Sequence, residues 1–205
     1  MNDFNPLNFL IFLLTRSLDV PAGDILIHAG DFTNFGDADN AKDFNEWLGD
    51  LPHPYKIVVN GNHESNAPWK NEVKKIVSNA TYLIGESHTI EWNGRSVKFY
   101  GTNFFWPMKD DDENPHFKQI DEDVDILVAH GPVDGYVDSG KGCGSLLRTC
   151  QRLQPNKLKL VISGHMHQGY GIAEGTGTCS GIKFVNGSNC GRFRKVVNEP
   201  IVVTI

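Results

Sequence analysis

Four short polar clusters in this chain of 205 residues carry side chains that bind metal ions. They supply one carboxylate, one amide and three imidazoles, from Asp31, Asn62, His130, His165 and His167. Oxygen and nitrogen ligands of these types suit Mn, Fe and Zn. Any one cluster alone is typical of an ordinary turn or of a hydrogen-bonded structural histidine. Together, and with neighbouring glycines that allow sharp turns, the clusters indicate a catalytic metal site.

Each polar cluster directly follows a short apolar segment, so the ends of strands are expected to deliver the ligands. The four segments are Asp24 to Ala29, Tyr55 to Val59, Val124 to Ala129 and Leu158 to Ile162. Short apolar runs of this kind are typical of buried strands. In layered α/β folds, functional loops gather at the edge where such strands end. We therefore expect the four clusters to meet at one edge of the fold.

The rest of the pattern predicts helices between these strands and mainly strands towards the carboxyl end. Helices are expected at Ala38 to Leu48, Trp69 to Val77 and Gly144 to Leu153. Asn93-Gly94 is a strong signal for a two-residue hairpin. The hairpin strands and the late strands are expected at His88 to Trp92, Ser96 to Tyr100, Ile172, Ile182 to Val185 and Ile201 to Ile205. This order predicts an α/β fold of two packed sheets covered by helices.

The ordered clusters resemble the signature of the calcineurin-like metallophosphoesterases. The matching residues are Gly30-Asp31, Gly61-Asn62-His63-Glu64, His130 and Gly164-His165-Met166-His167. The stretches from His28 to Thr33 and from His130 to Pro132 resemble small, single-domain members of that family. The similarity runs from about Arg16 to the carboxyl end. It implies a four-layer αββα sandwich of two mixed sheets flanked by helices.

The resemblance assigns metal-binding roles to the matching residues. Asp31 would bridge two ions, with Asn62, His130 and His165 completing the second site. His167 would belong to the first site. The implied cofactor is one or two divalent transition-metal ions, with Mn favoured over Fe or Zn. The implied substrate is a small phosphate ester or nucleotide, whose phosphodiester or phosphomonoester bond is hydrolysed by in-line attack at phosphorus.

The resemblance gives His63 a catalytic role instead of a metal-binding one. This residue would lie near the leaving group as a general acid or as a stabiliser of charge. In many members an Asp three residues after the bridging Asp pairs with this histidine, and here Asn34 stands at that position. An amide can orient an imidazole but stabilises its cation less than a carboxylate does. We therefore expect His63 to be a weaker acid or base than in family phosphatases.

The first metal-ligand motif of the family, an Asp-x-His at the end of the first strand, is absent before Asp31. Asp3 is followed by Phe4-Asn5, and Asp19 is followed by Val20-Pro21. We divide the chain into a divergent apolar N-terminal segment at 1–15 and a phosphoesterase domain at 16–205. The apolar stretch from Asn8 to Leu14 is suited to replace the first strand, but it does not replace the two ligands.

Three functional readings follow from this mixture of present and missing motifs. The first is a metal-dependent phosphoesterase, impaired by the missing motif. The second is a metal- or nucleotide-binding regulatory protein with weak catalysis or none. The third, ranked last, is a truncated product that does not fold stably, because a lost central strand would expose a sheet edge.

Composition narrows the class of protein and its partners. A net charge of −6 argues against nucleic acid as a stable partner. The apolar run from Phe9 to Leu14 is too short to span a bilayer, and no Lys or Arg precedes it, so a strand or an extension is favoured over a signal peptide. The four cysteines form no CxxC pair, which disfavours structural zinc. Reduced thiols and a cytoplasmic location are expected.

Several other residues have both a functional and an ordinary interpretation. His28 is interpreted as a core or supporting histidine instead of a ligand. The aromatic run from Phe104 to Trp106 is expected to pack in the core, with stacking on a nucleobase as the alternative. The stretch from Gly140 to Ser145 is either a substrate-contacting rim or a plain loop. His53, His88 and His116 are expected on the surface.

Overall fold

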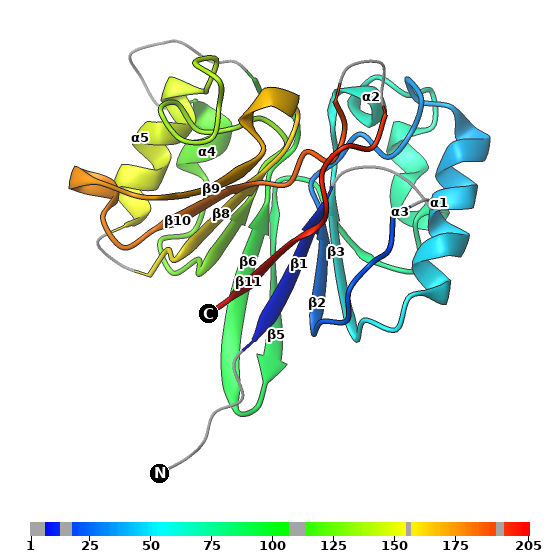
Figure 1. Ribbon diagram of the computed structural model, residues 1–205, viewed down its shortest axis with the longest axis horizontal. Helices are drawn as coiled ribbons and strands as arrows, with labels where there is room; N and C mark the ends of the chain where they lie inside the picture. Colours follow the sequence, from blue (N-terminus) through cyan, green and yellow to red (C-terminus); the bar gives the residue numbers. More distant parts are fainter. Residues whose placement is uncertain (1–6, 13–17, 107–113, 155–156, 192–194) are drawn as a thin grey trace.

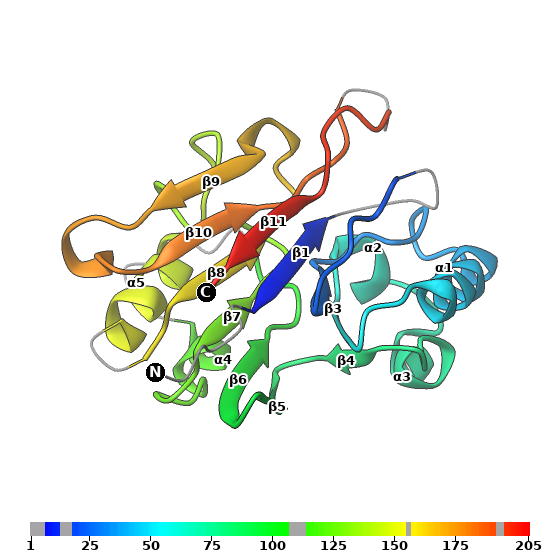
Figure 2. The same ribbon diagram turned by 60° about the horizontal axis from the view of Figure 1, so that its bottom comes forward.

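The computed structural model describes residues 7–12, 18–106, 114–154, 157–191 and 195–205. Figure 1 shows two β-sheets packed against each other, with helices on the outer face of each sheet. Figure 2 shows the same arrangement from below, with the strands of the two sheets side by side in the middle of the molecule.

The first sheet has five strands in the order β11-β1-β2-β3-β4. Their bounds are Asn8–Phe12 for β1, Ile25–His28 for β2, Tyr55–Val59 for β3, Thr81–Leu83 for β4 and Ile201–Thr204 for β11. The strands β1 to β4 pair in parallel, and β11 pairs antiparallel with β1. The carboxyl ends of β1 to β4 therefore lie at one edge of the sheet.

The second sheet has six strands in the order β5-β6-β7-β8-β10-β9. Their bounds are Glu86–Trp92 for β5, Arg95–Gly101 for β6, Ile126–Val128 for β7, Leu160–Ser163 for β8, Gly171–Glu174 for β9 and Lys183–Asn186 for β10. The inner strands β6, β7, β8 and β10 are parallel, while β5 and β9 run antiparallel at the edges. Asn93 and Gly94 both adopt positive φ in the β5–β6 turn, which confirms the predicted hairpin.

The helices form the two outer layers of the sandwich. The α-helices are α1 (Ala38–Asp50), α2 (Asn62–Ser65), α3 (Val73–Ile76), α4 (Pro115–Lys118) and α5 (Gly144–Leu153). Short 3-10 turns are η1 (Lys70–Glu72), η2 (His167–Gly169) and η3 (Gly177–Cys179). Figure 1 shows α1 and α3 beside the first sheet, and α4 and α5 beside the second.

The main core lies between the two sheets, because alternate residues of each strand point inward. Ile25 and Ile27 of β2 belong to this central core, whereas Leu26 faces the apolar layer beneath α1. A third apolar layer fills the space between the second sheet and α5. Burial on both faces explains why the parallel strands read as continuous apolar runs. The predicted four-layer αββα sandwich is thereby confirmed.

The apolar N-terminal segment supplies the first strand of this sandwich. β1 lies between β11 and β2 in the sheet, with Phe9 paired to Val203 on one side and Ile25 on the other. The Phe9 side chain is fully buried, and its ring centroid lies 6.3 Å from that of Phe99 in the opposite sheet. The strand predicted over Asn8 to Leu14 is therefore present over Asn8–Phe12, and residues 13–14 lie outside the described part.

Two expectations drawn from the sequence were wrong in detail. The predicted helix from Trp69 to Val77 is instead the 3-10 turn η1 followed by one α-helical turn, α3. Neither piece has a side-chain N-cap, and an uncapped segment this short does not sustain a longer helix. His53 is only 2% exposed, and its Nε2 atom lies 3.0 Å from the carbonyl oxygen of Pro21. The polar sequence around His53 gave no signal for this long-range contact.

The structure also describes the state of the cysteines and tests for a helix that could span a membrane. All four cysteines are buried and have free thiols. Across the part of the chain that is described, no helix has the length and apolar character needed to cross a bilayer.

The position of β1 leads to a stability prediction. Phe9→Ala should lower the free energy of unfolding by about 3–5 kcal/mol, because it leaves a cavity between the two sheets. Val202→Ala on the neighbouring strand β11 is the control, since Val202 is 46% exposed and should cost less than about 1 kcal/mol. Urea unfolding followed by circular dichroism measures both. Equal, small losses would contradict the burial of β1.

Candidate metal centre

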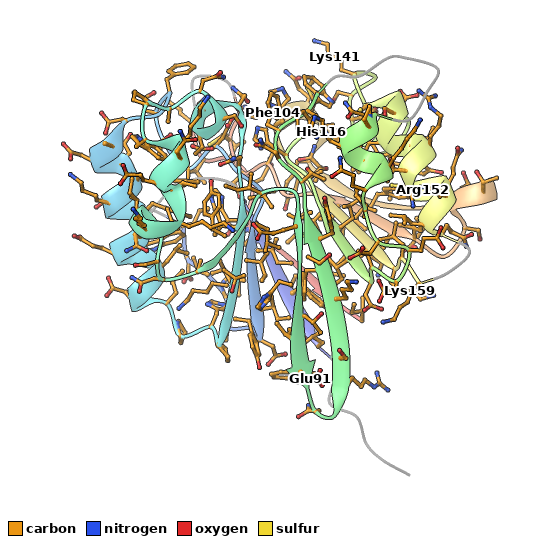
Figure 3. All side chains as sticks on the ribbon, turned by 180° about the vertical axis from the view of Figure 1, so that it is seen from behind. Glu91, Phe104, His116, Lys141, Arg152 and Lys159 are labelled. Carbon is orange, nitrogen blue, oxygen red and sulfur yellow. The ribbon has the colours of Figure 1, made fainter. Side chains whose placement is uncertain are left out.

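The four ligand clusters meet at one edge of the sandwich, as the strand directions require. Asp31 and Asn62 follow β2 and β3 of the first sheet, while His130 and His165 follow β7 and β8 of the second. This edge lies at the top of Figure 1, beside α2. Phe104, whose ring lies 5.4 Å from that of His130, marks the same edge from behind in Figure 3.

Donor atoms from both sheets converge on the Nε2 atom of His130. Asp31 Oδ2 lies 3.2 Å from it, Asn62 Oδ1 lies 3.2 Å from it, and His165 Nδ1 lies 3.1 Å from it. Ligand atoms bound at about 2.1 Å to one ion lie roughly 3 Å apart when they are adjacent. The four donors therefore fit one divalent transition-metal ion, and their mixture of oxygen and nitrogen suits Mn, Fe or Zn.

Hydrogen bonding and burial prepare these side chains for a cation. The Nδ1 atom of His130 lies 2.5 Å from the carbonyl oxygen of Ala29, so Nδ1–H donates there and Nε2 is the ring nitrogen that faces the site. Burial, and then the charge of His130, lower the pKa of His165 to about 4. His165 is therefore neutral near pH 7, the form that binds metal.

The charge of Asp31 is also fixed by its surroundings. Burial opposes its ionisation, but the hydrogen bond and charge of His130 outweigh burial and hold the pKa of Asp31 well below its usual range. The pKa of His130 is raised in turn, because Asp31 overcomes the effect of burial on that imidazole. Asp31 is therefore an ionised ligand across the physiological pH range.

Glycines allow the two loops of the first sheet to pack backbone against backbone. A Cβ on Gly30 would lie 2.4 Å from the nitrogen of Gly61, and a Cβ on Gly61 would lie 2.0 Å from Asp31 Oδ1. Asp31 and His165 themselves adopt left-handed backbone conformations, with φ of 58° and 60°. Such conformations are uncommon for residues with side chains, and strained examples cluster at functional sites. Close packing of these loops thus sets the direction of the Asp31 side chain.

Glu64 joins the same two loops through a fully buried carboxylate. Its Oε2 atom accepts hydrogen bonds from the backbone N–H groups of Asp31 at 2.8 Å and Gly61 at 3.0 Å. Its Oε1 atom accepts from the N–H and the hydroxyl of Thr33, at 3.0 and 2.7 Å. Burial and the nearby charge of Asp31 raise the pKa of Glu64. With its oxygens engaged in this way, Glu64 positions the site and is not available as a ligand.

Sequence reasoning left the role of Glu64 open. The available signal was the spacing Gly61-x-x-Glu64 at the start of α2, where an acidic side chain turns back to a backbone N–H group as in a capping box. The bonds to Asp31 and Thr33 had no local signal, because those residues lie more than thirty positions earlier.

His63 lies beside the ligands with one ring nitrogen directed to the site. Its Nδ1 atom lies 2.6 Å from the carbonyl oxygen of Thr33, so Nδ1–H donates there. Its Nε2 atom lies 3.7 Å from Asp31 Oδ2, and its backbone N–H donates to Asp31 Oδ1 at 3.1 Å. The Thr33 carbonyl thus orients this imidazole. In many family members that role belongs to an Asp at the position of Asn34.

Aromatic rings line the second-sheet side of the centre. Besides its contact with His130, Phe104 lies 5.6 Å from the ring of His165, and the Trp106 ring lies 4.3 Å from it. Both aromatic side chains are half-buried. They pack around the imidazoles of the site itself, and Phe105 and Trp106 also pack against the core beneath α5, as expected; stacking on a nucleobase stays a prediction.

Comparison with known proteins agrees with this geometry. Residues 6–169 match the family model of the calcineurin-like phosphoesterases. The chain belongs to this family. It is also 36% identical over 231 residues to the human metallophosphoesterase domain-containing protein 1, an alignment that covers 93% of this chain and 67% of the human protein. A UPF0046 protein of Caenorhabditis elegans is 32% identical over 93% of this chain and 71% of its own length.

A solved structure supports the fold of this phosphoesterase. The protein TT1561 of Thermus thermophilus superimposes with a TM-score of 0.57, and the alignment covers 89% of each chain. Its sequence is 13% identical to this one, so the similarity concerns the fold alone.

In this family member, the described residues bring one group of donor atoms together around His130. Among the described residues, the sets of three or more His, Cys, Asp or Glu side chains with ligand atoms within 4.8 Å are Asp31-His130-His165 and Asp31-His63-Glu64. His167, which begins η2, belongs to neither set, and its assignment to the first ion stays a prediction. Residues 13–17 follow β1 in sequence and include no carboxylate or imidazole. Among the described residues, the ligands that the resemblance implies for the first ion are therefore not brought together.

His28 supports the loop that carries Asp31 from within the core. It is fully buried, its ring packs edge-on against Phe44 with centroids 4.8 Å apart, and Gly30 N–H donates to its Nδ1 atom at 3.3 Å. Burial, and then the charge of His130, lower the pKa of His28 from 6.5 to about 3. The interpretation of His28 as a core histidine agrees with these contacts.

The role of Glu64 leads to a second prediction. Glu64→Gln places an NH₂ group against N–H donors and should cost about 2–3 kcal/mol of unfolding free energy. The variant should also bind Mn²⁺ more weakly, because the Asp31 loop loses its anchor. Glu72→Gln is the matched control, since Glu72 is exposed on η1. Wild-type stability and Mn²⁺ affinity in Glu64→Gln would contradict this role.

The pKa of His28 leads to a third prediction, for the metal-free protein. Between roughly pH 4 and 6, His28 is protonated in the unfolded chain and neutral in the folded chain, so stability falls as the pH drops. This residue should contribute about 1.4 kcal/mol per pH unit. In His28→Phe, the slope of unfolding free energy against pH in this range should fall by about that amount. An unchanged slope in urea titrations would show that His28 is protonated in the folded state.

Proposed function

We propose that this chain is a phosphoesterase that hydrolyses phosphodiester or phosphomonoester bonds of small substrates, and that it does so with one divalent ion, most readily Mn²⁺. The observation that carries the proposal is the convergence of Asp31, Asn62 and His165 on His130 Nε2 within 3.2 Å. Membership of the calcineurin-like phosphoesterase family supports the reaction class.

The side chains have separable tasks in this reaction. Asp31, Asn62, His130 and His165 would hold the ion. The bound ion supplies positive charge to the phosphoryl oxygens and lowers the pKa of a coordinated water. Because the pKa of Asp31 is low, its carboxylate would bind the ion in the ionised form. Because the pKa of His165 is lowered, its imidazole would be neutral and would offer the ion a lone pair.

The contacts of His63 support a role in handling a proton at the leaving group. Because its Nδ1–H is held by the Thr33 carbonyl, the exchangeable position is Nε2, which faces the same space as Asp31 Oδ2. A protonated Nε2 would give its proton to the departing alkoxide or stabilise its charge. The backbone carbonyl fixes the orientation of the ring without adding a full negative charge.

A second candidate function is favoured by the missing Asp-x-His motif. One ion held by Asp31, Asn62, His130 and His165 is sufficient to bind a phosphate group or a nucleotide. Without a second ion, the charge that stabilises an in-line displacement from both sides is reduced. The chain would then act as a metal- and nucleotide-binding regulatory protein with little turnover.

The fourth prediction separates the two functions. The purified chain, loaded with Mn²⁺, should bind one ion and hydrolyse bis-p-nitrophenyl phosphate or p-nitrophenyl phosphate. His165→Ala should weaken Mn²⁺ binding by more than about 100-fold, since loss of a group that only supports a ligand already costs roughly 10- to 100-fold. His88→Ala, on β5, is the control for removal of a histidine, and elemental analysis with a colorimetric assay measures both properties.

Each outcome of that experiment selects one reading. One ion with hydrolysis that His165→Ala abolishes supports the phosphoesterase. One ion without hydrolysis above the level of His165→Ala supports the binding protein. Two ions per chain would show that other residues complete a first site, and no bound ion would contradict both readings.

A further inference from the structure

Phe35 is an exposed aromatic side chain at the edge that carries the metal centre. Its exposure of 73% exceeds that of every other large apolar side chain among the described residues, the next being Val197 at 62%. The centroid of its ring lies 4.4 Å from that of His63, with the two planes inclined by 39°. A largely exposed aromatic side chain therefore lies next to the imidazole proposed to serve the leaving group.

The loop of Phe35 is held in place, although the side chain is exposed. Phe35 has a φ of 51° and Gly36 has a φ of 79°, so two successive residues are left-handed. Gly36 N–H donates to Thr33 Oγ1 at 3.0 Å, and Trp69 Nε1–H donates to the Gly36 carbonyl at 2.8 Å. Backbone strain of this kind persists where surrounding contacts enforce it, and it clusters at functional sites.

The position of Phe35 defines what it would contact during the reaction. In an in-line displacement the leaving oxygen departs on the side of the general acid. With His63 in that role, the alcohol part of the ester emerges beside the ring of Phe35. An exposed ring face binds flat apolar groups by stacking.

The charges of the same loop narrow the chemistry further. Between Asp31 and Asp37 the chain contains no Lys or Arg, and both ends of the stretch are acidic. This stretch therefore offers no cationic side chain to pair with a phosphate or carboxylate on the leaving group. An uncharged leaving group needs no such partner.

We propose that Phe35 is a substrate-contacting residue that selects esters with a flat, uncharged leaving group, an aryl or heteroaryl alcohol, over esters of small alkyl alcohols. The proposal rests on the phosphoesterase function proposed above, because that function places the leaving group beside His63. It deepens that function by naming the substrate class.

The fifth prediction uses phosphonates, which bind without being hydrolysed. Benzylphosphonate imitates an aryl ester, and ethylphosphonate imitates a methyl ester. The Mn²⁺-loaded wild-type chain should bind benzylphosphonate about 5- to 10-fold more tightly, the size expected of one aromatic contact. Calorimetric titration measures the ratio of the two dissociation constants.

Three variants test whether Phe35 is the source of that ratio. Phe35→Asn should reduce it to within about 2-fold, since Asn tolerates the left-handed backbone but removes the ring. Phe35→Tyr should keep the preference because it keeps the ring face. Val202→Thr, at an exposed apolar position on β11, should also keep it. Phe35→Leu keeps apolar bulk without a flat face and should lose most of the preference, which provides a further variant if Phe35→Asn folds poorly.

The result that would overturn the proposal is distinguishable from failure of the phosphoesterase itself. Equal wild-type affinity for the two phosphonates, no binding of either, or an unchanged ratio in Phe35→Asn overturns it. Equal weakening of both ligands in Phe35→Asn also overturns it, since the side chain would then act through His63. Phenyl phosphate turnover is measured on the same samples. Turnover without tighter binding of benzylphosphonate would contradict only the role of Phe35. Tighter binding of benzylphosphonate without turnover would contradict only the proposed hydrolysis.

Discussion

The buried carboxylate of Glu64 is the interaction on which the first-sheet half of the centre depends. Four donors from Asp31, Gly61 and Thr33 surround its two oxygens, and these donors belong to the loops after β2 and β3. A carboxylate in this position costs desolvation free energy, and only complete hydrogen bonding offsets that cost. The arrangement therefore tolerates little movement of either loop. The direction of the Asp31 side chain and the orientation of His63 both follow from this rigidity.

The same anchor connects metal binding to the surroundings of the leaving group. Thr33 donates to Glu64, orients His63 through its carbonyl and accepts the N–H of Gly36. Through these bonds the turn that presents Phe35 is part of the structure that fixes Asp31. A rigid support of this kind lowers the entropy lost when a substrate binds, because the contact surface is already ordered.

The centre also depends on the packing of the two sheets, since each sheet supplies half of the donor atoms. Asp31 and Asn62 come from the first sheet, and His130 and His165 come from the second. β1 contributes to that packing by placing Phe9 in the core between the sheets, even though the residues after it lack the family's first metal ligands. The chain thus combines the packed sandwich with donor atoms from both sheets that meet around His130, and with no Asp-x-His motif before Asp31.

Local sequence signals determined much of this protein. The strand at Tyr55–Val59 and the helix at Gly144–Leu153 were predicted with the observed bounds, and the Asn93-Gly94 hairpin followed from its turn residues. The ligand types, and their positions just after parallel strands, also follow from the chain itself, because the direction of a strand fixes which edge its loop reaches. Tertiary structure alone decided the burial of His53, the partners of Glu64 and the exposed ring of Phe35 beside His63. It also decided that His130, 101 residues after Ala29, donates to the Ala29 carbonyl. Such contacts join segments that are distant in sequence, and their geometry is set by how the two sheets and their loops pack, for which no local pattern carries information.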